Sequence, residues 1–235
     1  MSKINIDLKQ GIKAHIIHTE LYKTNMICVL MTMPLNKENV TKNALLPFLL
    51  RRGTENFPDQ YILNRELENM YGASFDCGID KMGDNQVIKF YIDTINNDYT
   101  LKNENILENS INMLLDIVFN PIFENGIFKK DFLEIEKENL KKVIESKIDD
   151  KDYYALDRCI SSMYKEEGFG IYKYGYVEDI EKITLEAITE HYKKVIQEAK
   201  IDIFLSGNFD EKEVKEILDN NENNQKFSPR IGNYI

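Results

Sequence analysis

The chain has 235 residues, of which 43% are hydrophobic, so it can form one large or two small domains with a packed core. Its formal net charge of −10 at pH 7 argues against a general nucleic-acid binder or a binder of anionic membranes, because the mean field would repel either partner. No apolar run approaches the length of a membrane span, and the N-terminus lacks the apolar core of a signal peptide.

The three cysteines, Cys28, Cys77 and Cys159, are odd in number and far apart in the sequence. Their spacing predicts neither a disulfide framework nor a cysteine-type zinc site. Reduced cysteines suit a reducing compartment, so we expect a cytoplasmic protein.

The first 34 residues predict a β-rich region. Residues 4–8 and 12–18 form expected strands around a turn at Gly11, and the apolar run 26–33 has the length of a strand buried on both faces. His15 and His18 lie three residues apart, which puts them on opposite faces of a strand. A joint metal site there is not expected.

Residues 39–54 read as an apolar helix that is closed by a glycine turn at Gly53. From composition alone, this segment is a core helix with a proline, Pro47, near its first turn. A second helix is predicted to begin after Pro58-Asp59 and to end at Gly72. Strands 73–81 and 86–95 should follow, joined through residues 82–85 in a hairpin-like connection.

The second half of the chain predicts mostly helices. Apolar periodicity indicates helices over residues 106–119, 129–148 and 152–164, and Thr184 is a candidate N-cap for the next helix. We place His191 on the surface of that helix. Residues 201–210 resemble a strand that ends in a glycine turn, followed by a helix over 211–218. The glycines of 168–175 lack the Gly-Lys-Ser/Thr ending of a phosphate loop, so no nucleotide site is predicted.

The segment around Gly53-Thr54 resembles the metal-binding helix of the insulinase or pitrilysin family of metallopeptidases. In that family H-x-x-E-H stands shortly before a Gly-Thr: the two histidines share one helix face and bind zinc, while the glutamate takes a proton from the bound water. In this chain Ala44 and Phe48 stand at the histidine positions, and Pro47 stands at the glutamate position. None of these side chains can perform the family's chemistry.

The third zinc ligand of the family is a glutamate on the long helix that follows. Aligning residues 136–144 with the family pattern puts Val143 at the ligand position, whereas a shifted register would put Lys142 or Glu145 there. One carboxylate without the histidine pair would bind zinc weakly. The resemblance therefore implies no catalytic residue, no bound metal and no cofactor.

Further motifs extend the resemblance over residues 4–215. Residues 67–75 are similar to the family's helix-Gly-strand passage, and residues 182–192 to its "Ile-Thr-x-x-x-Ile-x-x-x-Tyr" segment. The implied fold is α+β, a largely antiparallel sheet with helices packed mainly on one face. Residues 1–220 would form one insulinase-type lobe, and residues 221–235 would be a linker or the start of a missing second lobe.

In the family, the strand after that glycine is an exposed edge on which the peptide substrate lies as an added strand. Carried over to this sequence, the resemblance assigns peptide binding to six residues, Phe75, Asp76, Cys77, Gly78, Ile79 and Asp80.

The function that the resemblance implies is a non-catalytic homologue. Such a chain would bind a peptide or an unfolded protein segment and assemble with a second insulinase-type lobe or an active zinc-peptidase sister chain. Within the family it is similar to the bacterial non-catalytic partner in a peptidase-like pair associated with modification of elongation factor P. Two alternatives stay open: an active zinc metalloendopeptidase with an unusual site, and a purely structural subunit.

Overall fold

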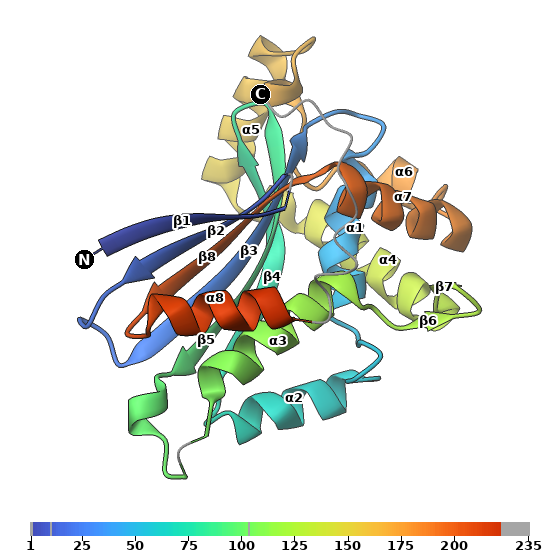
Figure 1. The fold of residues 1–235 in the computed structure, drawn as a ribbon. Helices are drawn as coiled ribbons and strands as arrows, with labels where there is room; N and C mark the ends of the chain where they lie inside the picture. Colours follow the sequence, from blue (N-terminus) through green and yellow to red (C-terminus); the bar gives the residue numbers. More distant parts are fainter. Residues whose placement is uncertain (1, 10, 103, 222–235) are drawn as a thin grey trace.

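In the computed structural model, which describes residues 2–9, 11–102 and 104–221, six strands form one sheet in the order β1-β2-β8-β3-β5-β4 (Figure 1). β2 and β8 run parallel, and the other neighbours run antiparallel. The strands are β1 (Ser2–Lys9), β2 (Ile12–His18), β3 (Thr24–Pro34), β4 (Ser74–Met82), β5 (Asn85–Ile95) and β8 (Lys200–Gly207). The predicted α+β class with a largely antiparallel sheet is confirmed.

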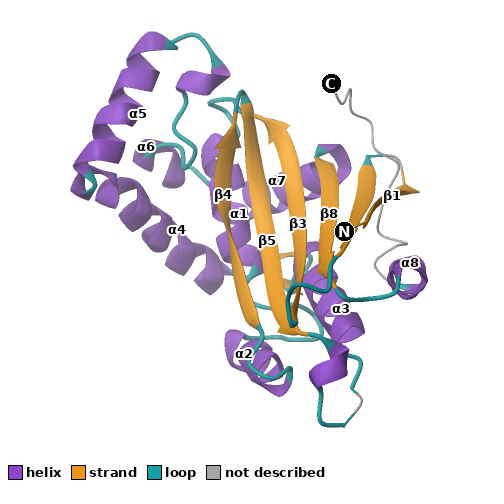
Figure 2. Cartoon of the chain, turned by 90° about the vertical axis from the view of Figure 1, so that its left-hand side faces the viewer, coloured by secondary structure: helices purple, strands orange, loops and turns teal. Residues whose placement is uncertain are grey.

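Within the described ranges, eight α-helices pack mainly on one face of this sheet. α1, α3 and α7 lie behind the strands in Figure 2, while the opposite face, which we call the open face, turns toward the viewer. The helices are α1 (Val40–Leu50), α2 (Gln60–Asn69), α3 (Ile106–Phe119), α4 (Lys130–Glu145), α5 (Lys151–Met163), α6 (Val177–Ile180), α7 (Leu185–Glu198) and α8 (Glu211–Asn220). Short 3₁₀ turns occupy Asn97–Tyr99, Ser146–Asp149 and Gly168–Gly170.

Strand β3 shows how the two faces differ. Ile27, Val29 and Met31 are buried under the helices, whereas the alternate residues Cys28 and Leu30 are only half-buried on the open face. The prediction that this strand is buried on both faces is therefore wrong. Its open-face side chains are apolar enough to imitate a strand that is covered on both sides.

Side-chain caps fix several helix starts. Asp59 accepts a hydrogen bond from the N–H of Ile62, and Thr184 Oγ1 accepts one from Ala187, so the predicted cap at Thr184 is confirmed. The long helix predicted over 129–148 ends earlier, at Glu145, and continues as the 3₁₀ turn. None of the described helices is long and apolar enough to cross a membrane.

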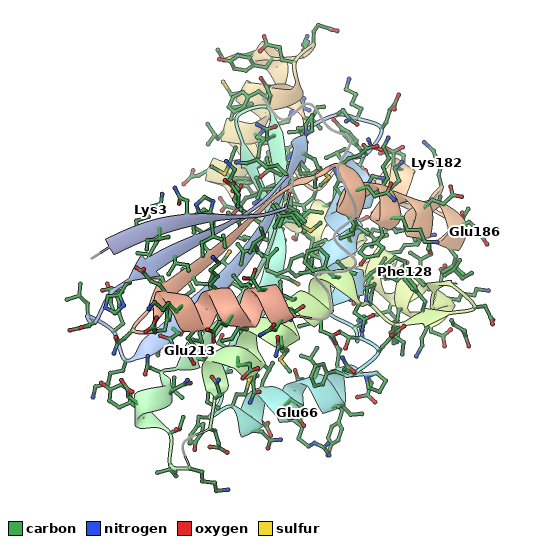
Figure 3. The ribbon with its side chains drawn as sticks, viewed as in Figure 1. Lys3, Glu66, Phe128, Lys182, Glu186 and Glu213 are labelled. Carbon is green, nitrogen blue, oxygen red and sulfur yellow. The ribbon has the colours of Figure 1, made fainter. Side chains whose placement is uncertain are left out.

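A two-stranded hairpin, β6 (Phe123–Glu124) and β7 (Ile127–Phe128), stands apart from the main sheet. Phe128, labelled in Figure 3, anchors it: its backbone N–H donates to Thr189 on α7, and its ring meets Tyr192 edge-on at 5.7 Å between centroids. Of the expected linker at 221–235, residues 222–235 lie outside the described residues, so the predicted boundary at residue 220 stays a prediction.

Candidate functional site

The three positions on α1 that the resemblance assigns to a metal motif hold packed hydrocarbon side chains. Ala44 is fully buried in the core, Pro47 is buried, and Phe48 is half-buried. Pro47 lies well inside the helix and not near its first turn as the composition suggested, and its carbonyl oxygen accepts hydrogen bonds from the Arg51 N–H (3.2 Å) and from the Cys77 thiol (3.3 Å). These positions offer no lone pair to a metal ion and no base to a water molecule.

The fourth position, Val143, lies half-buried on α4, the helix that packs against α1. The carboxylate that α4 does bury, Glu136, is fully buried and forms an ion pair with Arg52. The two register alternatives, Lys142 and Glu145, are exposed. Within the described part of the chain, no group of three or more His, Cys, Asp or Glu side chains could hold a metal ion. The residues at the positions that the resemblance assigns to zinc therefore do not fit zinc.

Cys77 lies on β4 with its thiol buried beside α1. Burial raises the pKa of this thiol to about 12, an effect that exceeds the opposing influence of Arg51. Because the thiolate is the nucleophilic and metal-binding form, the thiol is inert at neutral pH. Its role is to donate a hydrogen bond to the Pro47 carbonyl and to fill space between strand and helix.

The six residues predicted to bind peptide all lie in β4, which ends the sheet on one side (Figure 2). β4 pairs with β5 in an unbroken antiparallel register from Ser74 to Met82. Alternation turns Cys77 and Ile79 toward α1 and leaves Asp76, Gly78 and Asp80 on the open face. The edge position of these residues agrees with the resemblance, and peptide binding there stays a prediction.

Two carboxylates on the open face of β4 have different partners. Asp80 forms ion pairs with Lys89 (2.7 Å) and Lys173 (3.2 Å); burial raises its pKa, but the two lysines outweigh burial and hold the pKa below the usual range. Asp76 is exposed and accepts hydrogen bonds from the Tyr91 hydroxyl (3.0 Å) and from the Cys77 N–H (2.8 Å).

The histidines have separate roles. His15 on the open face bonds to Asp202 (2.8 Å), while His18 on the helix face bonds to the Phe209 carbonyl (3.2 Å), so the alternation predicted for them is confirmed. His191 contradicts its prediction, because it is buried and not on the helix surface. Tertiary packing of α7 against α1 covers it.

A buried polar network surrounds His191, and the sequence reasoning missed it. His191 Nε2 lies 2.6 Å from Asn43 Oδ1, and Asn43 Nδ2 donates to Gln86 Oε1 (2.8 Å). Because the Asn43 nitrogen is occupied as a donor, its oxygen accepts, which assigns the proton of the neutral imidazole to Nε2. Burial, with smaller effects from Lys42 and Lys194, lowers the pKa of His191 to about 4. The available signal was Asn43, a polar residue directly before the apolar run 44–50 of the same helix.

The glycine-rich segment is explained by close packing. Gly175 has a φ of 77°, and a Cβ there would collide with Thr41 of α1. A Cβ at Gly168 would lie 2.8 Å from the Leu35 carbonyl. Glycine lets this segment approach α1 and the end of β3. The decision against a phosphate loop is consistent with this packing.

Comparison with known proteins gives this arrangement a family context. No family model matches the chain. The chain is 34% identical over 222 residues to the probable inactive metalloprotease YmfF of Bacillus subtilis strain 168, a match that covers 93% of this chain and 52% of that protein. The chain thus spans about half the length of the curated relative.

Solved structures agree. A conserved protein from Enterococcus faecalis V583 is 31% identical with a TM-score of 0.89, over 98% of this chain and 53% of that one. The peptidase M16 inactive domain from Pseudomonas fluorescens has a TM-score of 0.75 at 13% identity, over 100% of this chain and 53% of that one, which shows the fold alone. The prediction of an inactive homologue is confirmed, because by sequence the chain is a homologue of a probable inactive metalloprotease. Its fold matches that of the M16 inactive domain.

Proposed function

We propose that this chain is the non-catalytic half of a peptidase-like assembly that holds an extended peptide or unfolded protein segment along the free edge of β4. The observation that carries the proposal is the position of this edge strand beside a helix whose metal positions, Ala44, Pro47 and Phe48, are hydrocarbon. Such a site can pair with a main chain and has no group to cleave it.

The backbone of β4 supplies the hydrogen-bonding groups. β4 and β5 are joined by the two-residue turn Gly83-Asp84, and Gly83 has a φ of 58°, as a type II′ turn requires. Residues that flank such a turn bond to each other, so pairing with β5 alternates from Met82 backward. The N–H and C=O groups of the alternate residues, Lys81, Ile79, Cys77 and Phe75, therefore point away from β5 toward the free edge, where an added strand would pair.

Assembly with a second half is the other part of the proposal. The chain matches about half the length of its relatives, which supports a partner lobe or sister chain of similar size. We further propose that the chain acts as the non-catalytic partner in a peptidase-like pair associated with modification of elongation factor P. The proposed location of this pair is the cytoplasm. Co-purification with a homologue that keeps H-x-x-E-H tests the assembly, and failure of every such homologue to associate would contradict it.

Peptide binding can be tested by NMR titration of ¹⁵N-labelled protein with an extended heptapeptide of alternating Val and Thr. We expect amide shifts at residues 75–81 and none at the opposite edge strand β1, whose register is irregular between Asp7 and Lys9. Equal shifts at both edges would indicate non-specific strand pairing. Silence at β4 would favour the purely structural subunit.

A further inference from the structure

We propose, resting on the function above, that Asp76 closes the β4 edge against neutral peptides and selects extended segments that carry a lysine or arginine side chain. The same carboxylate has both effects. It accepts a hydrogen bond from a backbone N–H that an incoming strand would need, and it has no cationic partner among the described residues that could draw it away from that N–H.

The closing contact lies within β4 itself. Cys77 N–H donates to Asp76 Oδ1 at 2.8 Å, and the Tyr91 hydroxyl donates to Asp76 Oδ2 at 3.0 Å, which holds the carboxylate in place. Cys77 is one of the residues whose N–H points away from β5. Its bond to Asp76 therefore satisfies one of the donors on the free edge, as natural edge strands do when they discourage unwanted pairing.

An added strand must displace this carboxylate to bond with Cys77. The displaced carboxylate stays on the open face, where a side chain of the added strand would stand about 5 Å away between Cβ atoms. A neutral side chain there forms no ion pair that would compensate the carboxylate for the lost hydrogen bond from the Cys77 N–H. A lysine or arginine side chain gives it an ion pair, which makes displacement less costly.

The charges around β4 explain why Asp76, and not Asp80, would select a basic side chain of the peptide. Asp80 already has two cations, Lys89 and Lys173. Among the described residues, no cation lies within ion-pair distance of Asp76. The chain's formal net charge of −10 adds a field that attracts basic segments.

Two substitutions separate the two effects. Asp76→Asn keeps an oxygen that can accept from Cys77 N–H and removes the charge, whereas Asp76→Ala removes both. Asp7→Asn is the matched control, because Asp7 is an exposed carboxylate on the opposite edge strand and its loss changes the net charge equally. The probes are two heptapeptides of alternating Val and Thr that carry either lysine or norleucine at the central position, titrated by NMR and calorimetry.

We expect the unmodified chain to prefer the lysine peptide about threefold, as an exposed ion pair allows. Asp76→Asn should abolish the preference with little change in norleucine-peptide affinity, and Asp76→Ala should raise that affinity about threefold to tenfold. Asp7→Asn should behave like the unmodified chain. If the peptides bind at β4 and these affinities do not move in Asp76 variants, the inference is wrong while the proposed function stands. If neither peptide binds the unmodified chain or any variant, both are wrong.

Discussion

Helix α1 meets two other helices through different chemistry. Toward α4, the positions that the resemblance assigns to a metal are hydrocarbon, and the polar contact is the ion pair of Arg52, just past the end of α1, with buried Glu136. Toward α7, Asn43 joins His191 and Gln86 in a buried network. The difference teaches that absence of the metal ligands did not make α1 apolar throughout. Buried polar groups occur in this helix where each one has a partner, as the cost of leaving one unpaired requires.

The largest expected effect comes from removing Asn43, which joins the buried network between α1 and α7. Asn43→Leu leaves His191 Nε2 and Gln86 Oε1 without this partner in the core, and each such loss costs about 1–3 kcal/mol. We expect the free energy of unfolding to fall by about 4 kcal/mol, measured by urea denaturation. Asn39→Ala is the control, because the Asn39 side chain makes no capping bond. Equal effects of the two substitutions would contradict an energetic role for the network.

Acid should lower the stability of the fold through the same buried network of His191 and Asn43. The pKa of His191 is about 4 in the folded chain, against the ordinary histidine value of about 6.5 in the unfolded chain, so between these values the unfolded chain binds more protons. The contribution of this group is constant above pH 6.5 and is lost as the pH falls, by about 3 kcal/mol between pH 7 and pH 4.

Urea denaturation at a series of pH values measures this loss. His191→Gln is the matched variant: it has no titrating group, and its stability should depend less on pH in this window. Parallel pH profiles for the variant and the unmodified chain would refute the assignment.

Introducing a histidine at a position that the resemblance assigns to a metal ligand should destabilise the fold. Ala44 is fully buried, so Ala44→His forces an imidazole into a packed core and should lower stability by about 2 kcal/mol. Phe48→His, at a half-buried position, is the comparison and should be tolerated better. Urea denaturation and zinc analysis after dialysis measure both. A double variant with unchanged stability and stoichiometric zinc would show a preformed site.

The smallest expected effect is at the surface of α1. The Arg51 guanidinium lies over the Phe48 ring, 5.3 Å from its centroid. Phe48→Leu keeps an apolar side chain and removes the ring, so we expect a loss of about 0.5 kcal/mol. Phe48→Tyr, which keeps an aromatic face, should show no such loss in the same denaturation experiment, and a larger loss for tyrosine would rule out the cation–π contact.

Much of the fold could be predicted because its signals are local. The helix over Ile106–Phe119, the cap at Thr184 and the alternation of His15 and His18 follow from periodicity and turn chemistry within a few residues. The candidate edge strand came from a resemblance carried by short motifs. The burial of His191 and the one-sided cover of β3 could not be predicted this way, because both depend on which element packs against them.

By itself, the sequence determined that the side chains of Ala44, Pro47 and Phe48 cannot coordinate a metal ion in any fold. Only the tertiary structure decided that β4 ends the sheet, that Glu136 pairs with Arg52, and that Asp76 caps the N–H of Cys77. The physical reason is that ligand chemistry belongs to a side chain, whereas exposure and pairing belong to residues that are brought together from distant parts of the chain.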